Sequence, residues 1–113
     1  MLLIHLPLSY GAKQASVVRE KWTALTDQWK ANAIFVSSFV FPGSGYVVAG
    51  KDTVTNKDIT TDGLKLISTI IIMALDFKEA IQLAKMCPIL EQEGIVEVRE
   101  VQPRPEIQTR TIA

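Results

Sequence analysis

The sequence of 113 residues has a single cysteine, a single histidine and no surplus charge of either sign. One cysteine cannot form an internal disulfide framework, and this composition is typical of proteins from reducing compartments. One cysteine and one histidine also supply too few of the usual ligands for a zinc site within one chain. We therefore expect no structural disulfide, no metal centre and no cofactor.

Charge and hydropathy exclude further classes of protein. The 12 Lys and Arg residues balance the 12 Asp and Glu residues, and no basic stripe is present, so nucleic acid is not an expected partner. The apolar start, residues 1–6, lacks the basic region and the cleavage pattern of a signal peptide. The longest apolar run, residues 66–75, is too short to cross a bilayer. We expect a cytoplasmic protein without a membrane segment.

The same apolar run is the strongest structural feature of the sequence. It is rich in isoleucine, a β-branched residue that suits a packed, extended backbone, so residues 66–73 are expected to form a central strand. Alternation along a strand places apolar side chains on both of its faces. The helices of one chain can cover one face of a sheet. A second copy of the chain is the expected cover of the other face, so the pattern predicts a homodimer.

The remaining segments alternate between strand and helix patterns. Apolar residues at helical spacing predict a helix over residues 14–30. A second helix is expected to begin at Asp76, which can cap it together with Glu79, and to end before Pro88. Three other strands are expected at residues 2–7, 33–40 and 95–102.

A polar excursion interrupts this alternation. Residues 46–50 and 57–60 flank a polar tip, residues 51–56, and are expected to form an inserted β-hairpin. Residues 91–94 are expected to be a solvated connection before the last strand.

The order of elements predicts an α+β fold of the ferredoxin-like type, βαββαβ with an inserted β-hairpin. Right-handed crossovers place both helices on one face of the sheet. The domain is expected to cover residues 1–103, and residues 104–113 form a C-terminal tail. Two isoleucines of the tail, Ile107 and Ile112, are expected to dock on the partner chain.

Several short motifs in a fixed order point to a known family. They are Asp62-Gly63, Asp76, Glu79-Ala80, Cys87-Pro88 and the closing Gly94-Ile95-Val96-Glu97-Val98-Arg99. This series resembles the YCII-related family, in particular its DGPF subgroup, over most of the chain. The resemblance implies a dimeric α/β barrel, built by stacking two sheets face to face. The His/Asp pair proposed as catalytic in the broader family has no histidine counterpart in the first helix here.

Strand parity brings out four candidate ligand-binding residues. If the apolar residues of the first and last strands face the helices, then His5, Glu97 and Arg99 face away from them. The first and last strands are neighbours in this order of elements, so the three side chains are expected to converge. Asp62, at the entrance of the central strand, is expected to line the rim.

These residues support three alternative functions. In the first, a cleft on the non-helical sheet face binds a small molecule, with an anion as the first expectation because an Arg fork holds carboxylate or phosphate groups. In the second, the protein is a cofactor-free enzyme, a monooxygenase or an isomerase, that uses His5 as its base. In the third, it is a purely structural interaction domain in which Glu97 and Arg99 neutralise each other. The sequence alone does not choose between enzyme and binding protein.

Overall fold

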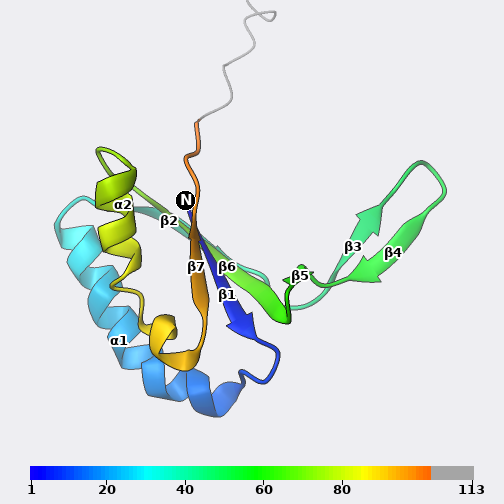
Figure 1. The fold of residues 1–113 in the computed structure, drawn as a ribbon, viewed down its shortest axis with the longest axis horizontal. Coiled ribbons are helices and arrows are strands. Elements are labelled where there is room, and N and C mark those ends of the chain that lie inside the picture. Colours follow the sequence, from blue (N-terminus) through cyan, green and yellow to red (C-terminus); the bar gives the residue numbers. More distant parts are fainter. Residues whose placement is uncertain (103–113) are drawn as a thin grey trace, which may run out of the picture.

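The structure, a computed structural model, describes residues 1–102 and has an α+β fold. An antiparallel sheet carries two helices, and a separate two-stranded hairpin extends from it (Figure 1). The elements in chain order are β1 (Leu2–Pro7), α1 (Ala12–Ala31), β2 (Phe35–Val40), β3 (Gly45–Val48), β4 (Val54–Lys57), β5 (Thr60–Thr61), β6 (Leu64–Ile72), α2 (Phe77–Ala84), the short 3-10 helix η1 (Pro88–Gln92) and β7 (Ile95–Val98).

The sheet has the strand order β2-β6-β1-β7, and every neighbouring pair is antiparallel. The short strand β5 pairs with the start of β6. The longest strand, β6, therefore lies inside the sheet, as its isoleucine-rich sequence predicted. The first and last strands, β1 and β7, are neighbours, as the order of elements also predicted. This pairing matters because it joins the two strands that carry His5 and Glu97.

The hydrophobic core lies between the sheet and the two helices, which Figure 1 shows on the same side of the sheet. Alternate residues of β1 supply its centre, namely Leu2, Ile4 and Leu6, each at most 1% exposed. Leu25 and Trp29 of α1 pack on them from the helical side. The burial of every second residue of β1 shows that the helices cover one face of this strand, as alternation along a strand requires.

A hydrogen bond caps the N-terminal end of each helix. The backbone N–H of Glu79 donates a hydrogen bond to the Asp76 carboxylate over 2.8 Å, so Asp76 caps α2 as predicted. The longer helix α1 starts after Gly11, whose N–H donates to the side-chain oxygen of Gln14 over 3.0 Å. This helix begins two residues earlier than expected, because Ala12 and Lys13 already have helical geometry.

Two turns with left-handed backbone fix the strand boundaries. Asp62 (φ 52°) and Gly63 (φ 77°) form the two-residue turn between β5 and β6, and positive φ at both positions is the hairpin geometry that Asp-Gly favours. Ala33 (φ 58°) is also left-handed, so β2 begins at Phe35 and not at residue 33 as predicted.

The inserted hairpin exists, but its second strand was predicted in the wrong place. Val54–Lys57, most of which was assigned to the polar tip, forms β4 and pairs with β3. The connecting turn is closed by a hydrogen bond of 2.9 Å from the Ala49 N–H to the Thr53 oxygen. Val54 and Thr55 are β-branched and extend the strand into the tip.

Near the end of the chain, one expectation holds in part and another was wrong. Residues 91–94 lead into the last strand with Glu91 and Glu93 exposed, as expected. The 3-10 helix η1, however, extends through Gln92, and Gly94 is buried. The strand β7 ends at Val98, four residues before the predicted end, because its partner β1 begins at Leu2. The tail prediction for Ile107 and Ile112 falls outside the described residues.

Within residues 1–102, neither helix combines the length and the apolar character needed to cross a membrane.

Candidate functional site

The histidine of β1 and the glutamate of β7 meet across the strand pair. Pairing of Leu3 with Glu97 and of His5 with Ile95 makes His5 and Glu97 diagonal neighbours on one face. Their side chains are hydrogen-bonded, with 3.2 Å between His5 Nε2 and Glu97 Oε1. An ionised carboxylate only accepts hydrogen bonds, so Nε2 is the donor. Both side chains lie on the sheet face opposite to the core residues of β1, as strand parity predicted.

Arg99 completes the cluster from the other side of Glu97. Its Nε donates a short hydrogen bond to Glu97 Oε2. The glutamate thus lies between a histidine and a guanidinium, with one carboxylate oxygen bonded to each. The prediction that these three residues converge is confirmed.

Exposure changes steadily along this cluster. The side chain of His5 is 9% exposed, that of Glu97 33% and that of Arg99 66%. The histidine is therefore a buried anchor, and the guanidinium is the part that a solute can reach. Within residues 1–102, the guanidinium of Arg99 donates its side-chain hydrogen bond through Nε. Its two terminal amino groups therefore remain for a ligand.

The electrostatics of the cluster favour an ionised carboxylate. The hydrogen bond from Arg99 is the largest influence and lowers the pKa of Glu97, and the charge of Arg99 and the contact with His5 act in the same direction. Desolvation works against them by raising the pKa. The net effect is a pKa below the ordinary value for glutamate.

A β-bulge lies beside the histidine. The register of β1 with β6 shifts between Ile4, which pairs with Ser68, and His5, which pairs with Leu66. Ile67 is the extra residue in β6. Bulges redirect neighbouring side chains and are enriched near functional sites. Because the extra residue is in β6, the alternation of β1 is undisturbed, and the bulge places Leu66 opposite His5.

Asp62 does not join the other three candidates. It belongs to the exposed β5–β6 turn, next to the end of β6 where Leu64 pairs with Pro7. Arg99 lies at the other end of β1, where its N–H bonds the Met1 oxygen. Six strand residues at about 3.4 Å each separate the two ends by roughly 20 Å. The sequence placed Asp62 at the strand entrance correctly, but its role there is that of a turn residue.

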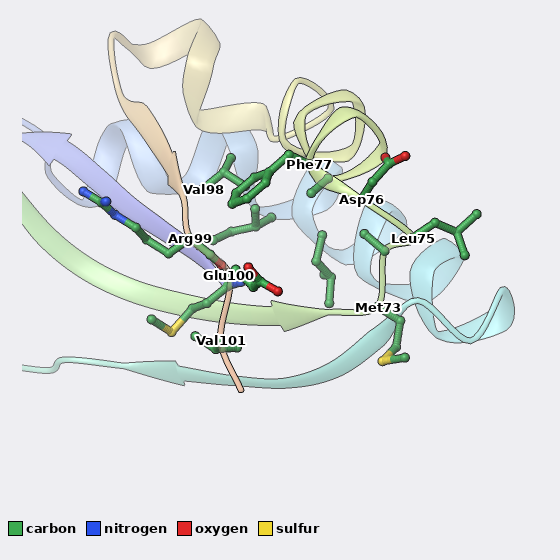
Figure 2. Close-up of a pocket in the computed structure, with 13 residues that line it drawn as sticks. Met73, Leu75, Asp76, Phe77, Val98, Arg99, Glu100 and Val101 are labelled. Atoms are coloured by element: carbon green, nitrogen blue, oxygen red, sulfur yellow. Dashed lines mark hydrogen bonds between the residues drawn. The ribbon is translucent and has the colours of Figure 1, made fainter. Parts of the chain in front are cut away.

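A cavity of ≈ 400 Å³ lies at the end of the sheet between β6, β7 and the start of α2. Its exposed apolar wall consists of Met73, Leu75, Phe77 and Val101, and Figure 2 shows the Arg99 side chain extending away from Phe77 and Leu75. Sequence reasoning missed this feature. The available signal was that the apolar run continues through Met73 and Leu75, beyond the end of the strand.

Other reactive groups add little to this picture. Within residues 1–102, no three His, Cys, Asp or Glu side chains are grouped so that they could hold a metal ion. Burial raises the pKa of the Cys87 thiol to about 12, so this cysteine is a core residue and not a nucleophile.

Comparison of the sequence with models of known protein families finds no match, and comparison with curated proteins finds none either.

Proposed function

We propose that the protein is a homodimeric domain that binds a small anion at Arg99, in a cleft on the sheet face opposite the helices. The hydrogen-bonded series His5–Glu97–Arg99 carries this proposal. A buried histidine fixes the glutamate, and the glutamate fixes the guanidinium by its Nε. A guanidinium held in this way loses little side-chain entropy when its terminal amino groups bind a carboxylate or phosphate.

The homodimer is supported by the character of the same sheet face. Leu3, Phe39 and Ile71 lie on it at positions that alternate with core residues, and Phe39 is largely exposed. Burying such side chains against a second copy is favourable by about 1.5–3 kcal/mol for each one that becomes fully buried. Stacking of two such sheets would give the predicted dimeric α/β barrel with a cleft between them.

The strand order and the YCII-like motifs support the finer assignment. The order β2-β6-β1-β7 with both helices on one face is the arrangement expected for a ferredoxin-like fold. The Gly94–Arg99 motif, which resembles that of the DGPF subgroup, supplies both Glu97 and Arg99, the two members of the cluster that a solute can reach. We therefore propose a YCII-like domain of the dimeric barrel type.

A cofactor-free enzyme with His5 as base is the second candidate. The hydrogen bond between His5 and Glu97 favours it, because a carboxylate that orients a histidine is a common catalytic arrangement. The small exposed fraction of His5 favours anion binding instead, since a base must reach the proton it removes.

The binding proposal is tested by calorimetric titration with inorganic phosphate and with malonate. We expect the protein to bind at least one of these probes, and Arg99→Gln to weaken its binding by roughly tenfold or more, because a charge-assisted hydrogen bond is lost. Arg19→Gln is the matched control, since Arg19 is exposed on α1 and distant in sequence from the cluster. Absence of binding to both probes, or equal affinity in the Arg99→Gln variant, would contradict the proposal.

An NMR titration of the Glu97 carboxyl tests whether the cluster exists in solution. We expect its pKa to lie below 4.5 in the unmodified protein and to rise in Arg99→Gln, because Arg99 is the largest cause of the lowered value. An unchanged pKa in the variant would show that the two side chains do not interact.

A further inference from the structure

Among the residues that the structure describes, the β3–β4 hairpin belongs to the longest exposed stretch. No residue of either strand is buried. Figure 1 shows the hairpin extending from the sheet on the side away from α1 and α2. A two-stranded hairpin alone is marginally stable in water, and three strands or a packing partner are usually needed.

One face of the hairpin is apolar. Directly opposite residues share a face, so the pairs Tyr46–Asn56 and Val48–Val54 place three exposed apolar side chains side by side. The other face pairs Val47 with Thr55 and is more polar. The hairpin is therefore amphipathic, although nothing in residues 1–102 buries its apolar face.

A second unpartnered apolar surface lies at the opposite end of the sheet. It is the wall of the ≈ 400 Å³ cavity, where Met73, Leu75, Phe77 and Val101 are all exposed. This wall adjoins the Ile72 end of β6, whereas the hairpin leads through β5 to the Leu64 end of the same strand. The length of β6, nine residues, separates the two surfaces.

We propose that the hairpin is an arm that packs its apolar face on the cavity wall of a second copy of the chain. The inference rests on the proposed homodimer and adds the symmetry and the contact residues. A twofold axis between two stacked sheets, running across the strands, reverses the strands of the partner. The Leu64 end of one β6 then lies over the Ile72 end of the other, and each arm meets the cavity of its partner. This is the reciprocal contact that a closed two-fold dimer requires.

The area of the open sheet face supports the need for an arm. Four strands about 4.8 Å apart and about six residues long give a face of roughly 20 Å by 20 Å, or about 400 Å². Stable interfaces bury about 800 Å² on each partner. Sheet stacking alone supplies about half of this, and the two arms lie where they can supply the rest.

A disulfide trap tests the contact. Val48→Cys and Leu75→Cys proteins are mixed under mild oxidation, and the products are resolved on a non-reducing gel and identified by mass. We expect a covalent heterodimer, because the arm of one copy meets the wall of the other; Cys87 does not interfere, since it is buried. Leu8→Cys is the matched control. Leu8 is exposed just beyond Pro7, at the Leu64 end of the sheet, so it should not couple to Val48→Cys.

The outcomes separate this inference from the proposed dimer. Coupling of Val48→Cys to Leu8→Cys in place of Leu75→Cys would mean that the strands of the partner are not reversed, and it would overturn the inference. A dimer of the unmodified protein that gives no coupling would overturn the arm contact alone. A monomer at all concentrations in sedimentation experiments would overturn both proposals.

Dissociation constants provide a second test that needs no cross-link. We expect the combined variant Tyr46→Ser, Val48→Thr and Val54→Thr to raise the dimer dissociation constant by roughly tenfold or more. Val47→Thr, on the other face of the same hairpin, should leave it unchanged. Equal dissociation constants for the combined variant and the unmodified protein would contradict the arm.

Discussion

The helix-covered core and the β3–β4 hairpin represent opposite ways of using apolar residues. In the core, Leu2, Ile4 and Leu6 are almost completely buried by the two helices of the same chain. In the hairpin, Tyr46, Val48 and Val54 are similarly apolar and lie largely exposed. The difference shows that hydropathy identifies residues that need a cover without identifying the chain that provides it. Stability of the monomer should therefore depend on the first region, and the proposed association on the second.

Removing a core side chain should have the largest effect. We expect Leu6→Ala to lower the free energy of unfolding by about 2–5 kcal/mol, because it leaves a cavity among close-packed neighbours. The exposed Leu8, two residues away, is a matched control, and Leu8→Ala should change stability by about 0.5 kcal/mol or less. Urea denaturation followed by circular dichroism measures both. Equal losses for the two variants would mean that the face of β1 is assigned wrongly.

A methyl group added at Gly94 should have an intermediate effect. A Cβ at this position would lie 2.7 Å from Ile89 Cδ1 and 2.9 Å from the His5 backbone oxygen. The backbone atom cannot move without shifting β7 from β1, so we expect Gly94→Ala to cost about 1–3 kcal/mol of stability.

The comparison for this second variant is Gly43→Ala, since a Cβ at Gly43 would have no neighbour within 4 Å. Denaturant titration of the two variants side by side is the measurement. A Gly94→Ala protein as stable as Gly43→Ala would show that β7 is not held tightly against β1 at this point.

Much of the fold follows from periodicity in the sequence. The isoleucine-rich run predicts β6, the helical spacing of apolar residues predicts α1, and Asp76 predicts the start of α2. Boundaries were less predictable where a single backbone torsion decides them. Ala33 has a left-handed backbone that no local sequence motif predicts. As a result, β2 begins two residues later than expected, at Phe35.

The candidate site was predictable to the extent that it depends on strand parity. His5, Glu97 and Arg99 meet because β1 and β7 are neighbours and alternate in the expected sense. Asp62 was expected to line the rim because it precedes the central strand, but the sequence does not indicate that this strand end lies at the opposite end of the sheet from Arg99. The cavity wall was missed because its residues come from two separate stretches, residues 73–77 and Val101, and their meeting depends on the path of the chain after β6.

The smallest expected effect on monomer stability belongs to the hairpin. Val54 is exposed and lies on the apolar face of β4, so in a monomer Val54→Ala removes few contacts and should lower stability by about 0.5 kcal/mol or less. The buried Val18 of α1 is the matched valine, and Val18→Ala should cost about 2 kcal/mol because its methyl groups are packed in the core. Both are measured by urea denaturation at a concentration at which sedimentation shows a monomer. A loss above about 1 kcal/mol for Val54→Ala would mean that the hairpin packs on its own chain, and the contrast between the two regions would disappear. A small loss in the monomer that grows as the protein concentration rises is the result that assigns the hairpin to the partner.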